Sequence, residues 1–274
     1  MTGRGYTLET AFLILTIGIS IAGFWTLYFG PEAAPNAFHH LHLVTSFAWL
    51  ALLLFQLRLM SAQRINLHRR VGRLVLILAP LLIASAALLS VNSAARALGS
   101  GQADPLIIQN VGVTIQLAIL LLLAFAMIGL PRLHGALLLS TALLFMGIAL
   151  VFALVSFVPA FRIEGPDTFD RFAQAAMTAT AFVGACAFVL FIKDYRNGWP
   201  YLIPVLFIVA NGLIDMQLSA SGETERLTAI VGAWNRYVTF LVAFFSVLGG
   251  LIALGVGRKQ RGARSLNSIT DTKQ

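Results

Sequence analysis

Charged residues and cysteine are both scarce in this chain of 274 residues. Only 11% of the residues are charged, compared with about 25% in a soluble domain. This low fraction excludes a water-soluble globule, a disordered protein and a typical nucleic-acid binder. The single cysteine, Cys186, excludes a disulfide bond within the chain. Hydrophobic residues make up 58% of the sequence, and the mean hydropathy is +0.85, so the composition indicates a protein built for a lipid bilayer.

Eight segments are long and apolar enough to cross a membrane. A transmembrane helix needs about 20 mostly apolar residues, and windows free of Asp, Glu, Lys and Arg occur at 10–31, 33–57, 74–95, 105–131, 133–161, 172–192, 197–214 and 237–257. We expect the seventh helix to continue through Asp215 to about Ser219, and the eighth to begin near Ala229. None of the windows alternates polar and apolar residues, as barrel strands do.

The sequence therefore predicts an all-α fold, an integral membrane helical bundle with eight transmembrane helices. Residues 1–257 form one membrane domain, and residues 258–274 form a basic tail that we expect to be disordered. With eight spans both termini lie on one side, which also carries 14 of the 19 Lys and Arg residues. Because basic residues accumulate in cytoplasmic loops, we predict that both termini are cytoplasmic. The net charge of +8 reflects this asymmetry and favours lipid headgroups, not nucleic acid, as its partner.

Polar side chains gather near the outer ends of three spans. They are His39, His42, Asn211, Asp215, Asn235 and Arg236. At a rise of about 1.5 Å per residue, His42, Asp215 and Arg236 lie within roughly 10 Å of the outer boundary. Because a charge in hydrocarbon costs about 2.5–3.5 kcal/mol, we expect Asp215 and Arg236 to form an ion pair. The whole set, with Trp49 on the second span and uncharged polar residues such as Asn110 at the same depth as the set, predicts a polar cavity open to the outer face.

The second span carries a polar stripe along one helix face. His39 and His42 are three residues apart and share this face, which continues through Ser46 and Trp49 to Gln56. Two imidazoles at this spacing are candidate metal ligands or proton carriers, with Asp215 as a third ligand. The alternative is that the histidines hydrogen-bond to headgroups and water while Trp49 packs in the core. The chain lacks the HEXXH and CXXC spacings that identify metal sites more specifically.

An arginine-rich turn joins the second and third spans on the cytoplasmic side. Its basic residues are Arg64, His68, Arg69, Arg70 and Arg73. Cations at the start of a helix oppose its dipole, so a bound anion would stabilise this turn. A phospholipid headgroup is the simplest candidate anion, although the accumulation of basic residues in cytoplasmic loops also explains the run. A weaker repeat of the pattern, Leu133-His134 after Arg132, joins the fourth and fifth spans.

These positions resemble a group of uncharacterised bacterial multi-pass membrane proteins. The group's pattern is an outer histidine that opens a span, a Trp and a Gln further along it, and an Arg-rich turn of the type Leu-His-Arg-x-x-Gly-Arg. The matching residues here are His42 or His39, Trp49, Gln56 and the stretch 67–73. A second Leu-His turn follows at 133–134, with Gly135 where the pattern has a basic residue. The resemblance covers residues 38–140 and implies the bacterial inner membrane, without implying an activity.

Four functions are consistent with this sequence. The first is binding of a small molecule or lipid in the outer cavity. The second is a membrane hydrolase or transferase that uses a metal or acid/base catalysis. The third is a haem or quinone redox protein, although His42 and His68 lie about 39 Å apart along a helix and cannot share one haem. The fourth is a structural or assembly partner without catalysis. The sequence points to no particular cofactor or protein partner.

Overall fold

The structure, a computed structural model, is all-helical over the residues that it describes, 5–31 and 33–271, and it leaves out the side chains of 166 and 256–271. The long helices are α1 (Thr7–Phe29), α2 (Ala37–Ser61), α4 (Val75–Gly99), α5 (Ile107–Ala126), α6 (Pro131–Phe157), α7 (Asp170–Lys193), α8 (Ile203–Ser221) and α10 (Arg236–Asp271). The short ones are α3 (Ile65–Gly72), α9 (Glu223–Gly232) and the 3-10 turns η1 (Pro159–Phe161), η2 (Pro166–Thr168) and η3 (Trp199–Leu202).

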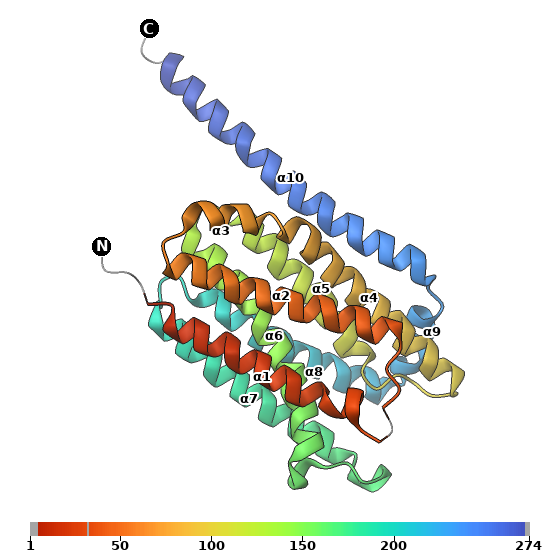
Figure 1. Ribbon diagram of the computed structural model, residues 1–274. Helices are drawn as coiled ribbons and strands as arrows, with labels where there is room; N and C mark the ends of the chain where they lie inside the picture. The colour runs from red at the N-terminus through yellow and green to blue at the C-terminus, as the bar shows by residue number, and fades with distance from the viewer. Residues whose placement is uncertain (1–4, 32, 272–274) are drawn as a thin grey trace.

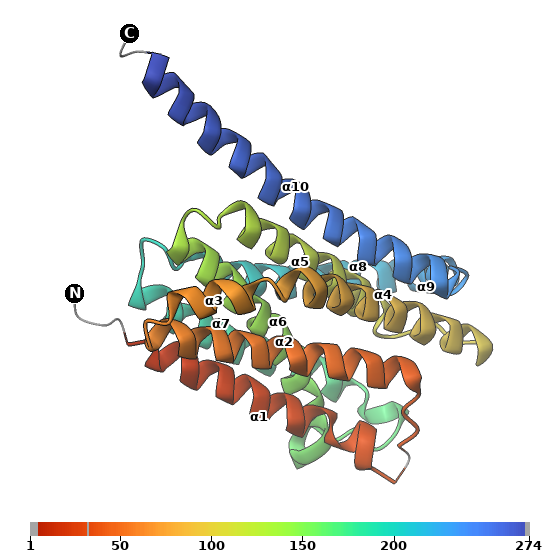
Figure 2. The same cartoon turned by 45° about the horizontal axis from the view of Figure 1, so that its top comes forward.

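Eight of these helices are long and apolar enough to span a membrane, which confirms the predicted fold class. The seventh candidate span runs from Trp199 to Ser221 and includes η3, and the eighth covers Arg236–Gly255 of α10. The spans lie side by side in one bundle (Figure 1). We call the end at which α1 begins and α2 ends the terminal end, and the opposite one the far end. Figure 2 shows α10 running along the bundle and leaving it toward the terminal end.

The bundle is organised around α6 and α4. α6 packs against α1, α5, α7 and α8, whereas α4 packs against α2, α5, α9 and α10. Small residues let some of these helices approach closely. A Cβ atom at Gly23 of α1 would collide with the backbone carbonyl oxygen of Ala149 on α6. The core between the helices is built from large apolar side chains such as Trp49, Leu82 and Leu143, all fully buried.

The start of the last span differs from the expectation that it begins near Ala229. Residues 223–232 form a separate helix, α9, and α10 begins only at Arg236. Asn235 accounts for the break, because its side-chain oxygen accepts hydrogen bonds from the backbone N–H groups of Tyr237 and Val238 and so caps α10. The expected continuation of the seventh helix past Asp215 is correct, since α8 ends at Ser221.

Most of the basic tail belongs to α10. The helix continues to Asp271, through most of the segment for which the sequence predicts disorder, and residues 272–274 lie outside the described part. The division into a membrane domain and a disordered tail therefore stays a prediction.

Candidate functional site

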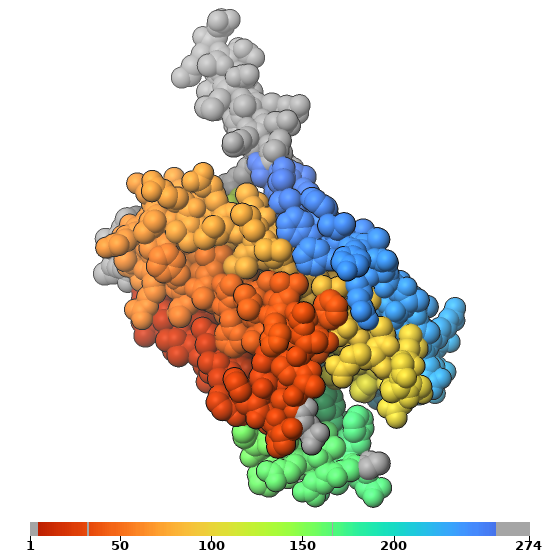
Figure 3. All heavy atoms as spheres, turned by 45° about the vertical axis from the view of Figure 1, so that its right-hand side comes forward, coloured from red at the N-terminus to blue at the C-terminus, as the bar shows by residue number. Residues whose placement is uncertain are grey.

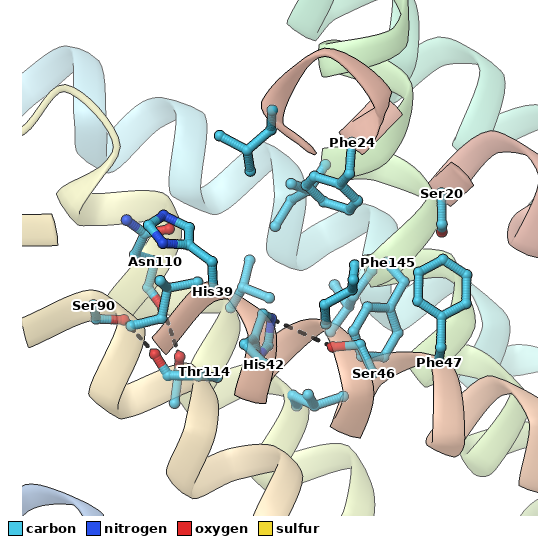
Figure 4. A pocket seen from close by; sticks show the side chains of 18 of the residues that line it. Ser20, Phe24, His39, His42, Ser46, Phe47, Ser90, Asn110, Thr114 and Phe145 are labelled. Carbon is cyan, nitrogen blue, oxygen red and sulfur yellow. Dashed lines mark hydrogen bonds between the residues drawn. The ribbon is translucent and has the colours of Figure 1, made fainter. Parts of the chain in front are cut away.

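A cavity of about 110 Å³ lies among five helices in the half of the bundle nearer the far end. It is lined by α1, α2, α4, α5 and α6, and we call it the histidine cavity because His39 and His42 both face it (Figure 4). Its other polar lining residues are Ser20, Tyr28, Ser46, Ser90, Asn110 and Thr114. The remaining wall is apolar and includes Phe24, Phe47 and Phe145. The lining contains no Asp, Glu, Lys or Arg.

His42 is held by hydroxyl groups at both ring nitrogens. Its Nδ1 is 3.2 Å from Oγ of Ser85, and its Nε2 is 3.4 Å from Oγ of Ser46. Oγ of Ser85 also lies 2.7 Å from Oγ1 of Thr45 and 2.9 Å from the carbonyl oxygen of Leu82. The ring therefore links α2 to α4 and has a fixed orientation in the wall of the cavity.

The hydroxyl groups around His42 form a small network with the backbone of α2 and α4. A serine hydroxyl has one proton to donate. Oγ1 of Thr45 lies 2.7 Å from Oγ of Ser85 and also 3.0 Å from the carbonyl oxygens of Leu41 and His42. Its single proton cannot serve all three contacts, so the protons of this network can be arranged in more than one way. In each arrangement both ring nitrogens of His42 lie next to a hydroxyl group of the protein.

His39 is positioned by the cap of its own helix. Oδ1 of Asn36 accepts hydrogen bonds from the backbone N–H groups of Phe38 and His39, at 3.0 and 3.3 Å, which satisfies the first donors of α2. Nδ1 of His39 lies 2.8 Å from the same oxygen. Its Nε2 has no hydrogen-bond partner among the described residues, and this nitrogen is therefore available to a ligand.

Two further polar groups at the cavity have no protein partner within the described part of the chain. The hydroxyl of Tyr28 is buried without a hydrogen bond, and the side-chain amide of Asn110 makes none, although its backbone oxygen accepts from Thr114. The sequence analysis did not select Tyr28, because an aromatic residue near a span end is typical of the membrane interface. Its spacing of four from Phe24 was the available signal, since this spacing puts both rings on one helix face.

Two predicted cavity residues connect helices instead of lining the cavity. Trp49 is fully buried and donates from Nε1 to Oγ1 of Thr141 on α6, at 2.9 Å. Asn211 of α8 exchanges two hydrogen bonds with Gln116 of α5. Both side chains can form hydrogen bonds and lie about where the sequence predicts the cavity along the spans. Their directions around the helix axis, however, put them in helix–helix contacts.

The predicted meeting of Asp215 and Arg236 does not occur. The ion pairs among the described residues do not include this pair. Asp215 is half-buried on α8, and exposed Arg236 places its guanidinium 5.3 Å from the ring centre of Phe38. No group of three His, Cys, Asp or Glu residues in the described part could hold a metal ion. The candidate metal set His39, His42 and Asp215 is therefore not assembled.

The arginine-rich turn forms a helix of its own, α3. Arg69 and Arg70 lie in its last turn, where cations interact favourably with the helix dipole. The unfavourable interaction expected from the sequence is confined to Arg64, the N-cap of α3, and Arg73, which directly precedes Leu74, the N-cap of α4. Arg64, Arg69, Arg70 and Arg73 are exposed, and none has an ion-pair partner among the side chains that the structure describes.

His68 turns away from these arginines toward the bundle. Its Nδ1 is buried without a hydrogen-bond partner, as are both side-chain polar atoms of Gln56 on α2. Burial is the largest cause that lowers the pKa of His68 from its usual 6.5, and the charges of His134 and Arg69 lower this pKa further. A backbone hydrogen bond with Gln56 acts in the opposite direction and raises it. The sequence grouped His68 with the arginines, whereas in the structure His68 is half-buried and its Nδ1 lies inside the bundle.

The eight long apolar helices define an integral multi-pass membrane protein. Comparison with models of known families, with curated proteins and with solved structures finds no match to this chain.

Proposed function

We propose that this protein binds an uncharged, lipid-soluble small molecule in the histidine cavity. The observation that carries the proposal is the combination of a lining without charged side chains and hydrogen-bonding groups without protein partners. The hydroxyl of Tyr28 has no partner, and Nε2 of His39 and the amide of Asn110 are unengaged in the described part of the chain. Because unpaired polar groups in an apolar setting cost free energy, a ligand that hydrogen-bonds to them stabilises the bundle.

The lining also limits the chemistry of the ligand. A charged group would be desolvated here without a counter-ion, which is unfavourable by several kcal/mol. A carbonyl or hydroxyl oxygen suits the cavity better, because the hydroxyl of Tyr28 and the side-chain NH₂ of Asn110 offer donors while the side-chain oxygen of Asn110 offers an acceptor. The aromatic rings of Phe24 and Phe145 surround the space with apolar surface. The expected ligand is therefore an apolar ring or chain that carries one or two neutral oxygens.

The volume of about 110 Å³ limits the size of the ligand. An engineered cavity of about 150 Å³ binds benzene, whereas sites for drug-sized ligands enclose about 300–1,000 Å³. The histidine cavity thus suits one ring, such as the head ring of a quinone, and is too small for the four-ring macrocycle of haem. The metal-dependent hydrolase or transferase loses its main support because Asp215 does not join the two histidines.

We further propose that the protein lies in the inner membrane of a bacterium with both termini in the cytoplasm. The excess of Lys and Arg on the side of the termini supports this orientation. The resemblance of residues 38–140 to bacterial multi-pass proteins supports the choice of membrane. The histidine cavity then lies in the periplasmic half of the bilayer.

Fluorine NMR with 4-fluorophenol tests the proposed binding. The wild type in lipid nanodiscs should broaden the fluorine signal saturably, beyond the effect of empty nanodiscs. Ala86→Leu, which adds atoms to the cavity wall, should remove the saturable part. Ala87→Leu is the matched control, since Ala87 is the next residue of α4 and does not line the cavity. Equal signals from the two folded variants would refute the proposal.

A further inference from the structure

The exposed side of α3 carries a row of arginines at one helical spacing. Asn66, Arg69, Arg70 and Arg73 stand at positions i, i+3, i+4 and i+7, which share one helix face. All four are exposed, and Arg73 keeps helical backbone angles just after the end of α3. The other face is turned inward, where Val71 packs against the hydrophobic core. We call the four exposed residues the arginine face.

Among the side chains that the structure describes, the arginine face has no ion-pair partner. The sequence contains no Asp or Glu between Glu32 and Asp104, so α2, α3 and α4 supply none. Of the acidic side chains that the structure describes, Glu9 and Asp194 lie at the terminal end, and both are occupied. Glu9 accepts from Lys193 at 2.6 Å, and Asp194 lies 3.7 Å from Arg132 and accepts from Asn197.

The position of α3 places this charge at the membrane boundary. α3 connects the end of α2 to the start of α4, two helices long enough to span a bilayer. Figure 3 shows the segment, in orange, on the surface at the end of the bundle near which α10 leaves it. Residues at this level meet lipid phosphates, and guanidinium groups bind phosphate through paired hydrogen bonds.

We propose that the arginine face binds a phosphate-bearing anion, with the headgroup of an acidic membrane lipid as its main source. Three guanidinium groups on one face surround a phosphate better than scattered cations do. Each cation near an anionic surface contributes about a five-fold increase in affinity. This site is independent of the histidine cavity, which lies in the other half of the bundle.

Native mass spectrometry with short-chain lipids tests the site. Dihexanoyl phosphatidylglycerol should bind the wild type in neutral detergent, and dihexanoyl phosphatidylcholine should bind much more weakly. The triple variant Arg69→Gln, Arg70→Gln, Arg73→Gln should lose about 100-fold in affinity for phosphatidylglycerol. If the triple variant fails to fold, each single variant should lose about five-fold.

A matched control separates the site from the effect of net charge. Arg162, Arg171 and Arg226 lie at the far end. Replacing these three residues by Gln lowers the net charge by the same amount as the triple variant of the arginine face. This control should keep wild-type affinity for phosphatidylglycerol; equal losses in both triple variants, or no loss in either, would overturn the proposal. Competition with inorganic phosphate identifies the source. Weak competition assigns the site to the lipid, and full competition at equal concentration assigns it to free phosphate.

Discussion

The pair formed by Gln116 on α5 and Asn211 on α8 should behave as a structural unit and not as part of a ligand site. Nε2 of Gln116 donates to Oδ1 of Asn211 at 2.6 Å, and Nδ2 of Asn211 donates to Oε1 of Gln116 at 3.1 Å. Asn211 is 2% exposed and Gln116 8%. Asn211→Leu keeps the approximate size of the side chain, removes both hydrogen bonds and leaves the amide of Gln116 without a partner.

The expected loss follows from these two bonds. Hydrogen bonds between membrane helices contribute about 0.6 kcal/mol on average and about 1.7 kcal/mol at most, and a buried group left without its partner costs about 1–3 kcal/mol. Asn211→Leu should therefore lower the free energy of unfolding by about 1–3 kcal/mol. Adding Gln116→Met removes the unpaired amide, so the double variant should be more stable than Asn211→Leu alone.

A double-mutant cycle measures this coupling. The free energy of unfolding is obtained from titration with sodium dodecyl sulfate in mixed micelles, followed by circular dichroism. The Asn211→Leu protein should still bind 4-fluorophenol like the wild type, because Asn211 does not line the histidine cavity. Additive losses in the cycle would refute the hydrogen-bonded pair. Loss of 4-fluorophenol binding by the folded Asn211→Leu protein would refute the placement of Asn211 outside the cavity.

Three further predictions concern the packing and the pH dependence of the bundle. Trp49→Phe removes the hydrogen bond to Thr141 and part of the buried side chain, so the free energy of unfolding should fall by about 1–2 kcal/mol; an unchanged value would contradict this role. Gly23→Ala should lower the free energy of unfolding by about 3 kcal/mol or more, because the added Cβ atom collides with α6. Gly18→Ala should leave the free energy of unfolding unchanged in the same titration, because the space around Gly18 is open. Since the folded pKa of His68 lies below 6.5, the unfolded chain takes up the proton first. Stability should therefore be full above about pH 6.5 and decrease below it, and His68→Gln should weaken that decrease in unfolding curves measured from pH 7.5 to 5; an identical decrease would exclude His68 as a cause.

The sequence was sufficient to predict the number of spans and their approximate bounds. Long apolar runs can satisfy their backbone groups in hydrocarbon only as helices, so composition alone determines these elements. Charge-free windows do not predict the break before Arg236, because such windows report hydrophobicity and not helix ends. The capping residue Asn235, one position ahead of the new helix, carried the signal.

The sequence predicted how deep in the membrane the candidate site residues lie. It predicted only partly the directions in which their side chains point. Position along a span gives depth, since each residue adds about 1.5 Å, and the sequence thus placed His42, Asp215 and Arg236 at similar levels. Direction around the helix axis depends on how neighbouring helices pack, which a single sequence does not give. His39 and His42 face the cavity because they share a stripe on α2, whereas Trp49 on the same stripe reaches α6.

We propose that the histidine cavity accepts a neutral ligand and excludes a charged one. The most direct test compares 4-fluorophenol with 4-fluorobenzoate, which has the same ring and a negative charge, on one nanodisc preparation of the wild type at pH 7.5. We predict saturable binding of the phenol alone, removed by filling the cavity at Ala86. Saturable binding of the benzoate that the same substitution abolishes would contradict the account.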